Sequence, residues 1–79
     1  MPATLDEVRG IIRDSFPGAN VEVSLKPDNI ITGTIYSEEF KNKDVSARNN
    51  LVWERVRNKL GLRGINVGVL FPLAPGERL

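Results

Sequence analysis

The densest group of chemically active side chains in this sequence is positively charged. Between residues 41 and 64, basic residues outnumber Asp44 and Glu54: Lys41, Lys43, Arg48, Arg55, Arg57, Lys59 and Arg63. On a helical wheel, Arg48, Arg55 and Lys59 form a basic flank beside an apolar stripe, with Leu51 just outside it. Spaced positive charge next to an exposed leucine suits contacts with phosphates or with an acidic protein surface. The alternative interpretation is a solvated helix face, whose cations interact favourably with the C-terminal end of the helix dipole.

A second candidate is the run Gly61-Leu62-Arg63-Gly64. It matches the GxxG pattern of loops that clamp a nucleic-acid backbone. That loop joins two helices, whereas here a predicted helix meets a predicted strand. The sequence therefore favours a helix stop followed by a turn over a phosphate clamp.

Composition argues against catalysis. The chain has no cysteine and no histidine, which removes thiolate chemistry and the commonest general base and metal ligand. Its serines consequently have no imidazole to activate them. Glu38 and Glu39 are adjacent in a predicted helical turn, where a capping or dipole role explains them. We expect neither an enzyme nor a cofactor-binding protein.

The 79 residues, with a net charge of +1, predict one small domain. No apolar run approaches the roughly 18 residues of a membrane span. The first residues lead directly into an amphipathic pattern that carries Asp6 and Glu7, so no signal peptide is expected. We expect a cytoplasmic protein.

The elements that position these residues can be predicted in order. A first helix follows Thr4, which forms a capping box with Glu7. Its apolar residues share one face: Leu5, Val8, Ile12 and Phe16. Residues 20–26 alternate apolar and polar side chains, which predicts a strand with Val21, Val23 and Leu25 on its buried face. After a turn at residues 27–29, residues 30–36 predict a second strand with Ile31 and Ile35 toward the core.

Ser37 should cap a short turn, and Asp44 or Ser46 should begin the main helix, which ends at Leu60 before Gly61. Its apolar stripe consists of Val45, Val52, Val56 and Leu60, with Trp53 at the edge. Residues 65–71 predict a third strand, because Ile65, Val67, Val69 and Phe71 alternate with Asn66, Gly68 and Leu70, and the first set should face the core. Pro72 should stop this strand, and an irregular tail should follow over residues 73–79. We expect the outer sheet face to be solvated, with too few aromatic residues for base stacking: Glu22, Ser24, Lys26, Thr32, Thr34, Tyr36, Asn66 and Leu70.

The order of these elements predicts an α+β domain with two layers. Its arrangement is helix-strand-strand-helix-strand, with helices on one face of a three-stranded mixed sheet. The first two strands should form a hairpin. A right-handed crossover through the long helix should bring the third strand into the same sheet, parallel to the second if the two are adjacent.

The joint order and spacing of several short motifs resemble BolA-like proteins, whose fold resembles the second type of KH domain. The similarity covers nearly the whole chain and is ungapped from Ser37 to Glu77. The residues that carry it include Ser37, Phe40, the Lys43 region, Arg48, the run 51–53, Leu60, the strand 65–70 and the ending 75–77. The resemblance implies a glutaredoxin partner, often with a shared [2Fe-2S] cluster, and in some members DNA binding.

The departures from the family pattern concern its histidines. Asn49 and Asn50 stand where Arg48 is usually followed by His-Arg, Asn66 stands where a histidine opens the last strand, and the loop at residues 27–29 has no histidine or cysteine. The last-strand histidine is the family's cluster ligand. Asparagine is a poor substitute for imidazole or thiolate, so we expect no bound cluster.

The leading hypothesis is a non-enzymatic adaptor or regulator that contacts a glutaredoxin-like protein without ligating a cluster. The contact would use the helix from Asp44 to Leu60, its basic flank and the turn from Gly61 to Asn66. Its predicted contact residues are Arg48, Leu51, Arg55, Lys59, Arg63 and Asn66, the last marking the lost ligand site. The alternative is a DNA-binding transcriptional regulator that uses the basic helix 44–60 and the turn 61–64. It would place the same basic residues on phosphates, with Arg63 near the nucleic-acid backbone. A degenerate family member with another role is a third possibility.

Overall fold

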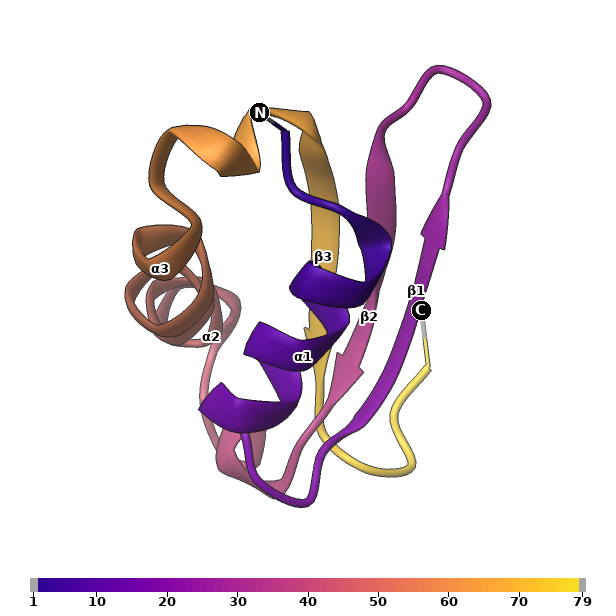
Figure 1. Ribbon diagram of the computed structural model, residues 1–79. Helices are drawn as coiled ribbons and strands as arrows, with labels where there is room; N and C mark the ends of the chain where they lie inside the picture. Colours follow the sequence, from indigo (N-terminus) through magenta and orange to yellow (C-terminus); the bar gives the residue numbers. More distant parts are fainter. Residues whose placement is uncertain (1, 79) are drawn as a thin grey trace.

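The computed structural model describes residues 2–78 and has the predicted two-layer α+β architecture (Figure 1). The elements are α1 (Leu5–Ser15), β1 (Asn20–Leu25), β2 (Ile31–Tyr36), a short 3-10 turn (Glu38–Phe40), α2 (Val45–Val52), a π-helical segment (Trp53–Arg57), α3 (Asn58–Leu60), a second 3-10 segment (Gly61–Asn66) and β3 (Val67–Leu73). Thr4 and Glu7 form the expected capping box, and Asp44 caps the main helix through the backbone N–H of Ala47.

The three strands form one sheet in the order β1-β2-β3. β1 pairs with β2 antiparallel, and β2 pairs with β3 parallel, as predicted for a hairpin followed by a helical crossover. Gly33 lies in the middle of β2, where a Cβ atom would approach the carbonyl oxygen of Glu22 to 2.1 Å. The close approach of β1 and β2 at this point therefore requires glycine.

The core lies between the sheet and the helices. α1 packs on β1 and against the π-helical segment, while α2 packs beside β3 (Figure 1). The fully buried side chains come from α1, β2, the first 3-10 turn and the main helix: Val8, Ile12, Phe16, Ile31, Ile35, Phe40 and Val56. On β1, Val21 and Val23 pack against the core as predicted, but the prediction is wrong for Leu25, which is 52% exposed at the end of this outer strand. Phe16 and Phe40 contact each other with ring centroids 5.1 Å apart.

The main helix runs from Val45 to Leu60, but its middle is π-helical. The backbone N–H of Asn58 bonds to the carbonyl of Trp53, five residues earlier. The predicted stripe is correct for Val52, Val56 and Leu60, which are all buried. It is wrong for Val45, which is 71% exposed because it lies in the first turn, beyond the edge of the core.

The third strand differs most from the prediction. It begins at Val67 and continues through Pro72 to Leu73. Ile31 lies opposite Val67 but Gly33 lies opposite Leu70, so β3 has one extra residue there and its alternation reverses. Leu70 is consequently buried, whereas Val69 and Phe71 are exposed. Their predicted orientations are thus wrong.

Pro72 does not end β3 because β3 is the last strand of the sheet. Ser37 donates its backbone N–H to the carbonyl of Leu73, so the backbone groups of Leu73 point toward β2 and those of Pro72 point outward. The missing N–H of Pro72 therefore removes no bond to β2.

The predicted irregular tail is partly packed. Leu73 belongs to β3 and Ala74 is buried. The side chain of Glu77 folds back to accept the backbone N–H of Ala74. Leu79 lies outside the described residues.

No helix in the described part of the chain combines the length and the hydropathy that crossing a bilayer requires.

Candidate protein-binding surface

An apolar groove lies where the main helix ends. We define it by its lining residues: Trp53, Arg57, Asn58, Gly61, Leu62, Gly64 and Ile65. Its volume is about 600 Å³. Leu62 is 96% exposed, Ile65 is 83% exposed and Trp53 is 60% exposed. A cluster of large apolar side chains left in water is unusual for a small domain and marks a surface for interaction.

The local backbone explains why Leu62 and Ile65 are exposed. Gly61 has φ of +56°, a conformation that glycine adopts readily, and it ends the helix. The 3-10 segment that follows then turns the chain toward β3. Leu60 points into the core just before this turn, whereas Leu62 and Ile65 point away from it. A side chain at Gly64 would crowd Leu60, because its Cβ atom would lie 3.1 Å from the Cβ of Leu60. Glycine at this position therefore leaves open space between the side chains of Leu62 and Ile65.

Trp53 is the first residue of the π-helical segment. It directly follows the buried Val52 and lies on the outer side of the helix, whereas Val56, four residues after Val52, is buried. The irregular turn is stabilised from α1, because the hydroxyl of Ser15 donates to the carbonyl of Arg55 at 2.8 Å. π-Helical turns occur frequently at functional sites, which is a second reason to regard this surface as a candidate site.

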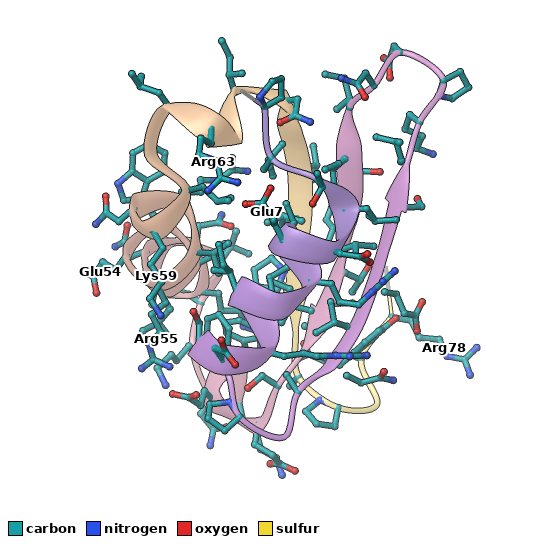
Figure 2. The ribbon with its side chains drawn as sticks, in the orientation of Figure 1. Glu7, Glu54, Arg55, Lys59, Arg63 and Arg78 are labelled. Carbon is teal, nitrogen blue, oxygen red and sulfur yellow. The ribbon has the colours of Figure 1, made fainter. Side chains whose placement is uncertain are left out.

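The basic flank, in contrast, is engaged within the fold. Arg55 donates to Glu39 at 2.6 Å and to the backbone carbonyl of Ser15 at 3.3 Å. Its guanidinium also lies over the ring of Phe16, 5.1 Å from the centroid. The ammonium of Lys59 lies 3.3 Å from the hydroxyl of Ser15. Figure 2 shows Arg55 and Lys59 on the same side of the long helix.

Arg48 is the most enclosed member of the flank, with 13% of its side chain exposed. It binds both carboxylate oxygens of Glu77, at 2.6 and 3.0 Å, and also donates to the carbonyls of Lys43 and Pro72. The hydrogen bond from Arg48, followed by that from the backbone N–H of Ala74, lowers the pKa of Glu77 to about 2. Arg48 thus fastens the C-terminal tail to the start of the long helix.

Two other predicted contact residues are also engaged. Arg63 forms an ion pair with Glu7 of α1, and Figure 2 shows the two side chains pointing toward each other. Leu51, expected to be exposed, is partly buried and packs against the core. Of the predicted contact residues, only Lys59 and Arg63 are classed as exposed.

Asn66 was predicted on the outer sheet face, but it is buried. It lies in the 3-10 segment before β3, and its amide nitrogen donates to the carbonyls of Ala3 at 3.1 Å and Asn29 at 3.4 Å. Asn66 thereby joins the N-terminal segment to the β1–β2 turn. Its Oδ1 atom is buried and has no hydrogen-bond partner among the described residues.

The resemblance to BolA-like proteins would place a cluster ligand at Asn66. The residues present do not fit a [2Fe-2S] cluster, because Asn66 offers neither thiolate nor imidazole and its amide nitrogen already donates to two carbonyls. Among residues 2–78, no group of three or more His, Cys, Asp or Glu side chains is placed to hold a metal ion. The groove therefore offers a partner an apolar contact surface bordered by positively charged side chains.

The sequence interpretation missed Leu62 and Ile65 as surface residues. Leu62 was considered only as the variable position of a GxxG pattern, and Ile65 was assigned to the buried face of the third strand. A signal was present, because Leu62 follows Gly61 and Ile65 follows Gly64 in the turn after the helix stop, where a chain reverses at the protein surface. Trp53 was recognised as lying at the edge of the core.

No protein-family model matches this sequence, and a search of curated proteins found no match.

Proposed function

We propose that this chain is a non-enzymatic binding module, similar to BolA-like proteins, that contacts a protein partner through the apolar groove. The observation that carries the proposal is the exposure of Leu62, Ile65 and Trp53 around one hollow. Burying large aromatic and aliphatic side chains at the centre of a contact supplies most of the affinity in many protein interfaces. Arg63, next to the groove in sequence, is half exposed, so its ion pair with Glu7 would lie in the polar rim of such a contact.

The partner that the family resemblance indicates is a monothiol glutaredoxin-like protein. The contact would involve the helix end and the turn at residues 61–66, the same part of the chain that the sequence interpretation selected. The residues in contact would differ from the predicted ones, because Trp53, Leu62 and Ile65 rather than Arg48 and Leu51 would make the central contacts. The complex would form without a bridging cluster.

Nucleic-acid binding has less support. It needs cations that are free to contact phosphates. Arg48, Arg55 and Arg63 each form an ion pair within the fold. The GxxG run lies in a 3-10 segment between a helix and a strand, unlike the helix-to-helix clamp it resembles in sequence.

The test is calorimetric titration of a monothiol glutaredoxin into the protein and two variants. Leu62→Asp places a charge in the groove and should weaken binding by at least about tenfold. Val45→Asp is the matched control, because Val45 is also an exposed apolar residue but lies in the first turn of the long helix, away from the groove. Equal affinity of the two variants would contradict the proposal, as would the absence of binding by the unaltered protein.

Leu51→Asp, an obvious choice from the sequence, is a poor probe. Leu51 packs against the core, so a charge there would disturb folding as well as binding.

Reconstitution of the same pair with iron and sulfide tests the absence of a cluster. The expected result is a complex whose visible spectrum lacks cluster absorption. A stable mixed complex with histidine-type cluster spectroscopy would contradict the donor argument based on Asn66.

A further inference from the structure

The two edge strands of the sheet differ in whether their outward-pointing backbone groups are protected against pairing with another strand. β1 and β3 are the outer strands, and Figure 1 shows the helices α2 and α3 on the side of β3, away from β1. An unpaired strand edge is a template for pairing with another chain. Whether each edge is protected therefore indicates where a second strand can bind.

The β3 edge is blocked. Arg57 donates to the carbonyl oxygens of Val67 at 3.4 Å and Gly68 at 2.7 Å. Farther along, Pro72 has no N–H, and its carbonyl accepts from Arg48 at 3.2 Å. Proline and inward-directed cations are common means of preventing edge-to-edge pairing.

Within Asn20–Leu25, β1 contains no proline, and no side chain of residues 2–78 donates a hydrogen bond to its carbonyl groups. The backbone N–H of Lys26 donates to Ile30 at 2.8 Å, so the backbone groups of Lys26, and of every second residue before it, point toward β2. The backbone groups of Val21, Val23 and Leu25 therefore point outward. Among residues 2–78, no segment beyond β1 forms backbone hydrogen bonds with them. Leu25 is also 52% exposed.

The residues of β1 fit a second copy of the same strand. If two copies pair antiparallel about Ser24, Val23 of each copy lies opposite Leu25 of the other, and these residues are the ones with outward backbone groups. Glu22 of each copy then lies opposite Lys26 of the other. Directly opposite residues that are not hydrogen-bonded bring their side chains closest, and opposite charges at such positions are favourable.

We propose that β1 is the docking edge for a second copy of this chain, which would join two sheets into one continuous antiparallel sheet across Ser24. The observations are the open edge and the charge complementarity of this register. Neither Glu22 nor Lys26 has an ion-pair partner within the described chain, so both charges are available for the contact. This edge lies at the end of the sheet opposite β3 and the apolar groove, and the two proposals are independent.

Sedimentation equilibrium of the full chain over a concentration series tests the proposal. A dimer is expected, and Lys26→Glu or Glu22→Lys should each weaken it by at least about tenfold, because both symmetric ion pairs become repulsive. The double variant Glu22→Lys/Lys26→Glu restores both pairs and should recover the dimer. Lys43→Glu makes the same change of charge on an exposed residue of the loop before α2, and it should have no effect.

A protein that remains monomeric at about 1 mM would overturn the proposal. So would a dimer that is equally stable in both single variants, or one that the double variant fails to recover. All the substituted side chains are exposed, so circular dichroism of each variant should match that of the unaltered protein.

Discussion

The basic flank and the apolar groove belong to the same long helix and its exit, but their side chains are used differently. Arg48 and Arg55 make their strongest contacts with the protein's own carboxylates, Glu77 and Glu39. In the groove, Leu62 and Ile65 lie almost completely in water. The charged residues thus hold the fold together, while the apolar residues remain available.

This difference reverses the usual expectation for a surface helix. Cations are normally exposed because their desolvation is costly, and large apolar residues are normally buried. Here the arginines gain paired carboxylates and the stacking of Arg55 on Phe16, which offset part of that cost. A count of positive charge in the sequence therefore overestimates the charge that a partner can reach.

Because the basic flank contacts the protein itself, we expect Arg55→Ala to lower the stability of the fold rather than the affinity for a partner. The variant loses the ion pair with Glu39, the contact with the Phe16 ring and the packing of a long side chain, together worth about 1–2 kcal/mol at this partly exposed site. The melting temperature should fall by about 4–16 °C. Thermal unfolding followed by circular dichroism measures the change.

Lys59→Ala is the matched control, since Lys59 is exposed and makes a single long contact with Ser15. Its free energy of unfolding should change by less than about 0.5 kcal/mol. If Arg55→Ala left stability unchanged but lowered affinity for the glutaredoxin, the flank would be a contact surface and the comparison would fail.

A second, smaller effect is a pH dependence that traces to Glu77. The Arg48 contact lowers the pKa of Glu77 to about 2 from an ordinary value of 4.5. A lowered pKa in the folded state stabilises the protein above the unfolded pKa, and this stabilisation is lost as the pH falls. The melting temperature of the unaltered protein should exceed that of Glu77→Gln above pH 4.5, and the difference should shrink as the pH falls toward about 2.

Glu54→Gln provides the comparison for this measurement, because Glu54 is exposed and forms no ion pair within residues 2–78. A gap between the unaltered protein and Glu77→Gln that stays constant from neutral pH to pH 2 would show that the ion pair with Arg48 contributes nothing.

Local patterns were sufficient to predict most of the fold. The capping box at Thr4, the alternation in β1 and the glycine stop at Gly61 each depend on neighbouring residues only. The third strand could not be predicted as well, because one extra residue between Val67 and Leu70 reverses every side chain that follows. Such a shift depends on how two distant strands fit together and leaves no local pattern.

The apolar groove lies in the stretch of chain that the sequence selected, the main helix and the turn after it, but none of the predicted contact residues lines it. The partners of the helix's arginines lie far along the chain. Glu77 is 29 residues from Arg48, and Glu39 is 16 residues from Arg55. Ion pairs over such separations are set by the folded topology, so the sequence alone overestimated the freedom of these cations.

The smallest effect that the comparison predicts concerns the stability of groove variants. Leu62→Ala should change the free energy of unfolding by less than about 0.5 kcal/mol, because the side chain is 96% exposed and contributes little to packing. Leu60→Ala, two residues earlier, removes a buried side chain and should cost about 2–5 kcal/mol. Urea unfolding of both variants measures the contrast. A large loss of stability in Leu62→Ala would mean that Leu62 packs against the rest of the protein and stabilises the fold. The leucine would then give no reason to infer a partner.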